Sequence, residues 1–308
     1  MNKNILVQTE NLNKRYRDTL VLDNVNLSIE KGKIYALIGQ NGAGKTTLIR
    51  ILTGLSFQSS GEVELFSKKG IKELEKQRKR IGSLIEGPTL YSSMTAYENL
   101  EAERICRGIP NKENIEKVLK LVGIDKIGRK KVKDFSLGMK QRLGIAMALL
   151  NNPELLILDE PINGLDPMGI IEIRDLIQNL NEKKGITIII SSHILSELYQ
   201  LATNYIIIDK GRILENITLG QLDEKCKKHI AIKVNDVPLA TTVIENNLNT
   251  SNFKVMDDGT IKLYDHLDKV SEVSSILSQN GLIIMQITIL GDSLEDYFVQ
   301  LIGGKFND

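Results

Sequence analysis

One nine-residue segment constrains the fold of this chain more than any other. Residues 39–47 read Gly-Gln-Asn-Gly-Ala-Gly-Lys-Thr-Thr, after the apolar run 34–38 and before an apolar pattern of helical spacing at 48–52. The spacing G-x-x-x-x-G-K-T between a strand and a helix is typical of a loop whose backbone N–H groups bind a polyphosphate. Lys45 would reach the β and γ phosphates, and Thr46 would offer its hydroxyl to Mg²⁺. A glycine-rich turn with a chance lysine is the alternative, which this context disfavours.

Length and charge predict an intracellular enzyme of two domains. The 308 residues suggest one large α/β domain followed by a smaller one. Residues 215–308 hold 8 basic and 14 acidic side chains, which leaves 32 basic and 25 acidic ones in residues 1–214. That basic surplus suits an enzyme that binds a polyanion and is too dilute to argue for DNA binding. Cys106 and Cys226 have no disulfide or zinc spacing and indicate a reducing compartment.

No stretch of the sequence is predicted to cross a membrane. Residues 1–10 have too short an apolar core for a signal peptide. The longest apolar stretch, 282–290, is interrupted by Gln286 and Thr288 and is too short for a transmembrane helix. Any membrane role is therefore expected to come from another polypeptide. The basic segment 68–80 is most simply a solvated helix face, with a surface facing anionic lipid headgroups as the alternative.

Antiparallel strands are predicted before the phosphate loop, and a parallel strand after it. Alternation of apolar and polar residues at 22–29 indicates a half-buried strand. Tyr16, in the preceding polar connection, could stack on a purine or could be an ordinary half-exposed tyrosine. The strand at 80–85 is stopped by Gly-Pro, which places Glu86 at its carboxyl end, where parallel sheets collect ligand contacts.

Residues 87–150 are predicted to form an inserted helical subdomain. Thr95 precedes Glu98 by three positions, the spacing of a capping box. The segment ends in Phe-Ser-Leu-Gly-Met-Lys-Gln, where Ser136 would cap a helix over 143–150. This helix start could receive a second anion, or Ser136 could be a plain N-cap.

Two further strands end in residues with catalytic potential. The apolar run 155–158 ends in Asp159 and Glu160, as expected of a buried parallel strand that delivers acids at its C-terminal edge. Asp159 could hold Mg²⁺ through water, and Glu160 could polarise a water for attack on a γ phosphate. The strand 186–192 ends at His193, whose place at the tip of a parallel strand favours a functional role over a structural one.

The remaining residues predict a hairpin and a second small domain. Residues 206–214 read as a hairpin with Lys-Gly at its turn, which closes the first domain. A connector with a short helix is expected over 215–229. Residues 230–308 alternate as strand, helix, strand, strand, helix and strand, followed by a helix, the order of a ferredoxin-like α+β sandwich. His229 and His266 are isolated there and form no catalytic constellation.

Over residues 1–214 the ordered set of motifs resembles the ATP-binding subunits of ABC transporters, which are P-loop NTPases. The resemblance implies an α/β ATPase domain with an antiparallel β subdomain and an inserted helical subdomain. It assigns adenine stacking to Tyr16, the signature segment to residues 136–141 and the D-loop to Asp166. The residues then expected are Lys45, Glu160 and His193 for catalysis; Tyr16, Gly39, Asn41, Gly42, Ala43, Gly44, Lys45, Thr46, Thr47, Ser136, Gly138 and Asp166 for ATP; and Thr46, Glu86 and Asp159 for Mg²⁺.

Within that family the chain is similar to the ATPase subunits of bacitracin-resistance and lantibiotic-immunity exporters. Glu86 stands where most relatives have the Q-loop glutamine, and a small α/β tail follows the ATPase domain. The signature reads Phe-Ser-Leu-Gly-Met-Lys-Gln in place of Leu-Ser-Gly-Gly-Gln. Because Leu137 and Met139 replace the usual residues, only Ser136 and the Gly138 amide carry over as phosphate contacts.

The resemblance also implies partners and a location. ATP would lie head to tail between two such subunits, whose closing and reopening would drive a separate membrane permease. The subunit would be cytoplasmic, peripheral on the inner face of the cell membrane, without direct contact to nucleic acid. The expected function is an ATPase that powers export of a bacitracin- or lantibiotic-like peptide. An ABC ATPase acting on DNA or ribosomes, or a regulatory module with vestigial hydrolysis, is the alternative.

Overall fold

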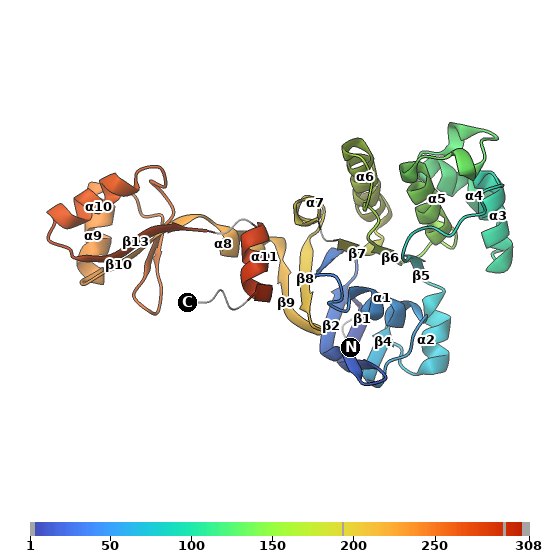
Figure 1. The fold of residues 1–308 in the computed structure, drawn as a ribbon, viewed down its shortest axis with the longest axis horizontal. Coiled ribbons are helices and arrows are strands. Elements are labelled where there is room, and N and C mark those ends of the chain that lie inside the picture. Colours follow the sequence, from blue (N-terminus) through green and yellow to red (C-terminus); the bar gives the residue numbers. More distant parts are fainter. Residues whose placement is uncertain (1–3, 193, 292–293, 304–308) are drawn as a thin grey trace. The chain divides into compact units, whose positions relative to one another are not determined.

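The computed structural model describes residues 4–192, 194–291 and 294–303. The chain divides into two compact units, residues 1–219 and 220–308 (Figure 1). The first unit extends beyond the predicted boundary at residue 214 because its last strand, β9 (Arg212–Thr218), pairs with β8 as far as Thr218. Among the described residues, no helix combines the length and apolarity that a membrane span requires.

An antiparallel sheet precedes the phosphate loop, as predicted. Its strand order is β2-β1-β4, with β1 pairing antiparallel to both neighbours. On β2 the side chains of Val25, Leu27 and Ile29 are buried, and those between them are more exposed, which is the expected alternation. The strands are β1 (Ile5–Tyr16), β2 (Thr19–Glu30) and β4 (Ser60–Leu65).

A six-stranded sheet of order β5-β6-β7-β3-β8-β9 forms the centre of the first unit. All adjacent strands are parallel except β9, which is antiparallel to β8. Every residue of β3, β6 and β7 is buried, as expected of parallel strands covered on both faces. The strands are β3 (Ile34–Ile38), β5 (Ile81–Leu84), β6 (Leu155–Asp159), β7 (Thr187–Ser192) and β8 (Asn204–Asp209).

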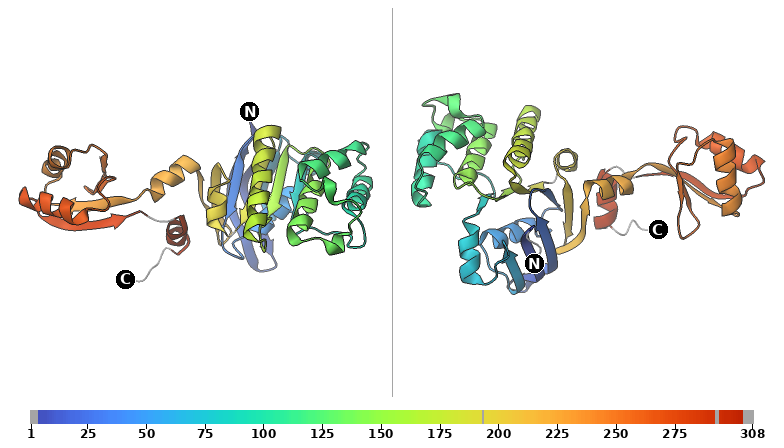
Figure 2. Two further views of the ribbon diagram at one scale, coloured as in Figure 1. Left: turned by 90° about the horizontal axis from the view of Figure 1, so that it is seen from above. Right: turned by 180° about the vertical axis from the view of Figure 1, so that it is seen from behind.

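Helices of the first unit connect the strands of this sheet and pack beside it. Helix α1 follows β3 through the phosphate loop, and α6 lies along one face of the sheet in the left view of Figure 2. Gly211 and Lys210 both have positive φ at the β8–β9 turn, the geometry of the tight hairpin predicted there. The helices are α1 (Lys45–Thr53), α2 (Ile71–Arg78), α6 (Pro167–Lys184) and α7 (Leu195–Tyr199).

A group of helices between β5 and β6 forms the inserted segment (Figure 1). The capping box is present: Thr95 Oγ1 accepts from Glu98 N at 3.2 Å, and Glu98 Oε2 accepts from Thr95 N at 2.7 Å. The predicted helix start at 143 is wrong, because the Ser136 hydroxyl accepts from Met139 N at 3.2 Å and the helix begins directly after it. The helices are α3 (Ala96–Cys106), α4 (Glu113–Leu121) and α5 (Leu137–Leu149), with 3-10 turns at Asp125–Ile127 and Val132–Asp134.

The second unit has the βαββαβ element order indicated by the sequence. Its sheet has the order β11-β12-β10-β13, and all neighbouring strands are antiparallel. Ile232, Ile244, Leu263 and Val273, from two strands and both intervening helices, are fully buried in one core. The elements are α8 (Leu219–Cys226), β10 (His229–Val234), α9 (Val237–Asn247), β11 (Phe253–Val255), β12 (Ile261–Leu263), α10 (Val270–Gln279), β13 (Ile284–Leu290) and α11 (Leu294–Gly303).

Candidate functional site

The phosphate loop packs closely against the sheet, and glycine makes this possible. A side chain at Gly39 would place its Cβ 2.4 Å from the carbonyl oxygen of Ile208. Gly44 has φ +109 and is the N-cap of α1 without a side-chain cap bond. The first N–H groups of a helix have no intrahelical partner. The loop therefore presents backbone donors and the positive end of the α1 dipole to the same space.

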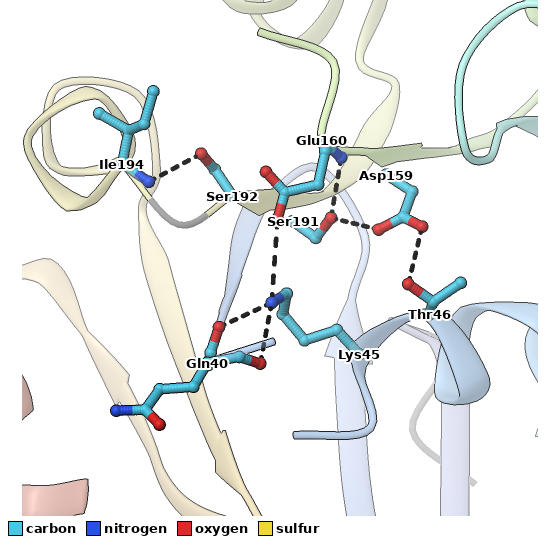
Figure 3. Close-up of polar contacts among 9 residues, drawn as sticks. Gln40, Lys45, Thr46, Asp159, Glu160, Ser191, Ser192 and Ile194 are labelled. Carbon is cyan, nitrogen blue, oxygen red and sulfur yellow. Dashed lines mark hydrogen bonds and ion pairs between the residues drawn. The ribbon is translucent and has the colours of Figure 1, made fainter. Parts of the chain in front are cut away.

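Lys45 is held inside this loop. Its side chain is only 7% exposed, and Nζ donates to the carbonyl oxygens of Gly39 at 2.6 Å and Gln40 at 3.3 Å (Figure 3). Nζ also lies 3.8 Å from Glu160 Oε1. A lysine ammonium has three donor positions, so the side chain can exchange a carbonyl partner for a phosphate oxygen with little movement.

The far end of α1 is anchored by a half-buried arginine. Arg78 Nε donates to Leu52 O at 3.2 Å, and Arg78 Nη2 donates to Ile51 O at 3.1 Å. These bonds satisfy carbonyls at the helix C-terminus, where a positive charge is favourable. Burial lowers the pKa of Arg78 from its usual value, yet a guanidinium keeps its charge in a protein. The helix that carries Lys45 is thereby fixed at both ends.

Polar side chains from α1, β6 and β7 meet at the carboxyl edge of the parallel sheet (Figure 3). Asp159 is 3% exposed, and its two oxygens have different partners. Oδ2 accepts from Thr46 Oγ1 at 3.0 Å, and Oδ1 accepts from Ser191 Oγ at 2.5 Å. The topology brings these residues together because β6 and β7 are adjacent and parallel, so both strands end at one edge.

Glu160 leaves the strand in an unusual backbone conformation. Its φ is +51°, in the left-handed region that non-glycine residues rarely adopt. Its N–H donates to both oxygens of one residue, Ser191 O at 3.1 Å and Ser191 Oγ at 2.9 Å. The chain turns here, and the Glu160 carboxylate comes close to Lys45 (Figure 3).

A pocket of about 210 Å³ lies over the phosphate loop. It brings most of the predicted loop residues together with Glu160, and Asp159 contacts Thr46, but Gly39 and Ala43 do not line it. Val21 and Gln40 also line it, although neither was predicted individually as an ATP contact; an apolar strand residue such as Val21 offers no motif by which to find it. The lining residues are Val21, Gln40, Asn41, Gly42, Gly44, Lys45, Thr46, Thr47 and Glu160.

Tyr16 is the last residue of β1 and is not one of the described residues that line this pocket. It is 43% exposed, its hydroxyl is 3.3 Å from Ser56 Oγ, and Lys14 Nζ lies 4.6 Å from its ring centroid. Tyr16 thus belongs to a strand and not to the polar connection in which it was predicted, and His193 lies outside the described residues. Adenine stacking by Tyr16 and a role for His193 both stay predictions.

Hard oxygen ligands suited to Mg²⁺ are present, and two of the three predicted ones lie together. Thr46 and Asp159 are in contact, whereas Glu86 Oε1 pairs with Arg50 Nη2 at 2.5 Å. Glu86 is 61% exposed and has φ +57°. The described residues contain no group of three or more His, Cys, Asp or Glu side chains able to hold a metal. Mg²⁺ is commonly bound by one or two protein oxygens, with phosphates and water completing its shell, and Thr46 and Asp159 fit that pattern.

The predicted signature residues Ser136 and Gly138 lie at the start of α5, and the predicted D-loop residue Asp166 lies at the start of α6. Ser136 is the exposed N-cap of α5, and a Cβ on Gly138 would lie 3.9 Å from Leu165 Cδ2, near the start of α6. Asp166 is the exposed N-cap of α6 and makes no side-chain cap bond. None of these three lines the pocket over the phosphate loop. Within one chain, the structure therefore does not bring Ser136 to Lys45.

Family models match the first unit. The model described as "ABC transporter" matches residues 22–163, which include the phosphate loop, Ser136 and both acids. A second, described as "AAA domain, putative AbiEii toxin, Type IV TA system", matches residues 131–198.

Curated relatives extend the likeness to as much as 97% of the chain. The "Bacitracin transport ATP-binding protein BcrA" of Enterococcus faecalis is 44% identical over 299 residues, 97% of each protein. The "Lantibiotic transport ATP-binding protein SrtF" of Streptococcus pyogenes is 47% identical over 209 residues, which are 68% of this chain and 89% of that protein.

Solved structures share the fold of the first unit. CbiO1 from Clostridium perfringens, part of an ABC transporter complex, has a TM-score of 0.66 at 31% identity and covers 72% of this chain and 92% of its own. The ATP-binding cassette MJ0796, in a dimeric post-hydrolysis state bound to ADP and Pi, has a TM-score of 0.63 at 28% identity and covers 70% of this chain and 99% of its own. With these relatives and this site, the chain belongs to the ATP-binding proteins of ABC transporters and is an ABC-type ATPase.

Proposed function

We propose that this protein powers the export of a membrane-active peptide, such as bacitracin or a lantibiotic. Its hydrolysis of ATP would drive a separate membrane permease that carries the peptide. The observation that carries the proposal is the likeness to BcrA over 97% of both chains. That likeness includes the second unit, which lies outside the phosphate-loop pocket. A shared second unit supports a shared specialised task, because any ABC ATPase shares the first.

The phosphate loop would bind the β and γ phosphates of ATP. Its backbone N–H groups and the start of α1 offer donors, and Lys45 offers a charge held at the same place by loop carbonyls. The loop and Lys45 need little rearrangement, so little free energy is spent on ordering them.

Thr46 and Asp159 would hold Mg²⁺. The Thr46 hydroxyl can turn its lone pair to a metal once its hydrogen points to Asp159, and the carboxylate is held by two hydrogen bonds. When bound, the ion would neutralise charge on the β and γ oxygens. Glu86 would approach this place only after leaving Arg50, so we propose for it a role in coupling the metal-bound nucleotide to the helical segment.

Glu160 would orient and deprotonate the attacking water. Its carboxylate lies beside Lys45 and therefore beside the proposed γ-phosphate position. His193, the residue that follows β7 in the sequence, would assist at the γ phosphate, a role carried over from the family resemblance.

A second copy would complete the site. Ser136, Gly138 and Asp166 lie outside the pocket of their own chain, so a head-to-tail dimer would supply them from the partner. The dimeric structure of the cassette MJ0796 supports the formation of a dimer. Binding to a permease would hold the protein at the inner face of the cell membrane.

Resistance of living cells tests the function. A strain lacking this protein and its permease is complemented with wild-type, Glu160→Gln or Glu272→Gln protein plus the permease. Glu272 is a matched control, since it is an exposed acid of the second unit that pairs with Lys269. We expect wild type and the control to raise the inhibitory concentration of bacitracin or a lantibiotic, and Glu160→Gln not to. Equal inhibitory concentrations in all strains would overturn the export function, and copurification with ribosomes or DNA would favour the alternative.

A further inference from the structure

The side chain of Ser191 forms hydrogen bonds with both acidic residues of the site, Asp159 and Glu160. It is fully buried and lies on β7 directly opposite Asp159 in the strand pairing. We infer that Ser191 is a positioning residue that sets the geometry of the metal-binding carboxylate and of the base together. This inference rests on the roles proposed above for Asp159 and Glu160.

The direction of each hydrogen bond follows from the groups involved. An ionised carboxylate only accepts, and a backbone amide only donates. The Ser191 hydroxyl must therefore donate its single hydrogen to Asp159 Oδ1 at 2.5 Å and accept from Glu160 N at 2.9 Å. The resulting chain runs from amide to hydroxyl to carboxylate, and each bond polarises the next.

The bond to Asp159 assigns one task to each carboxylate oxygen. Because Ser191 occupies Oδ1, Oδ2 is the oxygen that faces Thr46 and the proposed metal position. Rotation of the carboxylate would break both bonds at once. The geometry thus holds Asp159 ready for the ion before the ion arrives, as pre-organised sites require.

The bond to Glu160 holds a backbone conformation that is unfavourable by itself. A non-glycine residue at φ +51° persists only where its surroundings determine it. Two oxygens of Ser191 accept from the Glu160 N–H, at 2.9 and 3.1 Å, and so fix the peptide at which the chain turns. The direction of the Glu160 side chain toward Lys45 depends on that turn.

Ser192 provides a matched control on the same strand. It is also fully buried, but its hydroxyl accepts from Ile194 N at 3.0 Å (Figure 3). Removal of either hydroxyl leaves one half-buried amide with one acceptor fewer. Only Ser191→Ala also removes the donor to Asp159. Ser191→Thr keeps the hydroxyl and suits a strand.

The experiment measures metal dependence and turnover in full-length protein. The first readout is the dissociation constant of the nonhydrolysable analogue AMP-PNP with Mg²⁺ and with EDTA. We expect Ser191→Ala to bind AMP-PNP in EDTA with the wild-type dissociation constant. The factor by which Mg²⁺ lowers that constant should be at least about threefold smaller in Ser191→Ala than in wild type. We expect its kcat to fall by about tenfold or more with little change in the KM for ATP. Ser192→Ala should resemble wild type in both readouts, and Ser191→Thr should recover most of the loss.

Thermal unfolding of each variant separates positioning from a structural role. The inference is overturned if Ser191→Ala lowers Tm but leaves both kcat and the effect of Mg²⁺ on AMP-PNP binding unchanged. It is also overturned if Ser192→Ala reduces kcat and the Mg²⁺ effect as much as Ser191→Ala does. Glu160→Gln in the same series tests the proposed function separately. Normal turnover there would remove Glu160 from its role, whereas the Mg²⁺ effect in Ser191→Ala does not depend on Glu160 being the base.

Discussion

The sheets of the two units place polar groups differently. In the first unit the parallel strands β3, β6 and β7 end at one edge, where Thr46, Asp159 and Ser191 meet although they are far apart in the sequence. In the second unit all neighbouring strands are antiparallel, so successive strands end at opposite edges. Among the described residues its polar contacts form separate small sets, such as Asp258 with Lys233 at 3.2 Å and with Thr260. Parallel topology is what turns scattered motifs into one site.

Burial follows the same division. In the six-stranded sheet of the first unit, the central strands β3, β6 and β7 are mainly apolar and are buried on both faces. In the second unit the edge strand β13 keeps Met285 67% exposed and Ile289 48% exposed. The central strands of the six-stranded sheet are therefore fully buried, whereas the edge strand β13 of the second unit carries exposed apolar side chains.

The largest expected effect belongs to the polar edge of the first unit. Glu160→Gln removes the proposed base, and we expect turnover to fall by about 10²- to 10⁴-fold while ATP binding is retained and the dimer forms on ATP. Phosphate release, equilibrium binding and light scattering with and without Mg-ATP measure these. Glu272→Gln, from the second unit, should change none of them. Near-normal turnover in Glu160→Gln would contradict the assignment of catalysis to the polar edge of the first unit.

A smaller effect is expected at Glu86, which lies near the edge but is engaged with Arg50. Glu86→Gln should leave turnover within about tenfold, a barrier change below roughly 1.4 kcal/mol, because exposed ion pairs contribute little. Glu86→Ala should weaken cellular resistance more than turnover. Glu62→Ala is the control, since Glu62 is equally exposed at 61% and pairs with Lys69 at 2.6 Å.

Two outcomes would revise the position of Glu86. A loss of hydrolysis as deep as that of Glu160→Gln would make Glu86 catalytic. Unchanged resistance in both Glu86 variants would remove the coupling role.

Truncation tests whether the second unit is separable. A chain ending at Leu219 keeps β9 complete, and we expect its affinity for ATP to stay within about threefold of the full chain. A chain ending at Gly211 loses β9, leaves β8 at an open edge, and should unfold at a lower temperature. Calorimetric titration with ATP and thermal unfolding compare the two. An unfolded fragment from the first cut would mean that the second unit is needed to fold the ATPase.

The smallest effect concerns a turn of the second unit. Hydrogen bonds from Thr260, followed by the bond from Lys233, lower the pKa of Asp258 from 3.8 to about 2. The depressed pKa means that Asp258 contributes stability above pH 3.8 and loses it as the pH falls to about 2. We expect Asp258→Asn to unfold more easily than wild type at pH 5 and to match it near pH 2, measured by urea denaturation. The same difference at both pH values would contradict the assignment.

Local sequence signals predicted most of the fold. The glycines and Lys45 of the phosphate loop, the capping box at Thr95 and the Lys-Gly turn of the β8–β9 hairpin each depend on a few adjacent residues, and the structure contains all three. The predicted start of α5 at residue 143 was wrong because Gly138 and Lys140 interrupt the apolar spacing, whereas the Ser136 cap alone starts the helix. The boundary at residue 214 was placed early because polar residues on β9 hide its pairing to β8.

The amino-acid pattern alone was sufficient to locate the phosphate loop and the acids Asp159 and Glu160, because backbone geometry and strand burial demand those residue types in adjacent positions. The contacts among them needed the folded chain. Ser191 follows an apolar run just as Asp159 does, but nothing local says that its hydroxyl joins two acids on a neighbouring strand. Likewise, Arg50 and Glu86 pair only because α1 and the end of β5 are brought side by side. Such partners depend on strand order, which is decided when the whole core packs and not by any short segment.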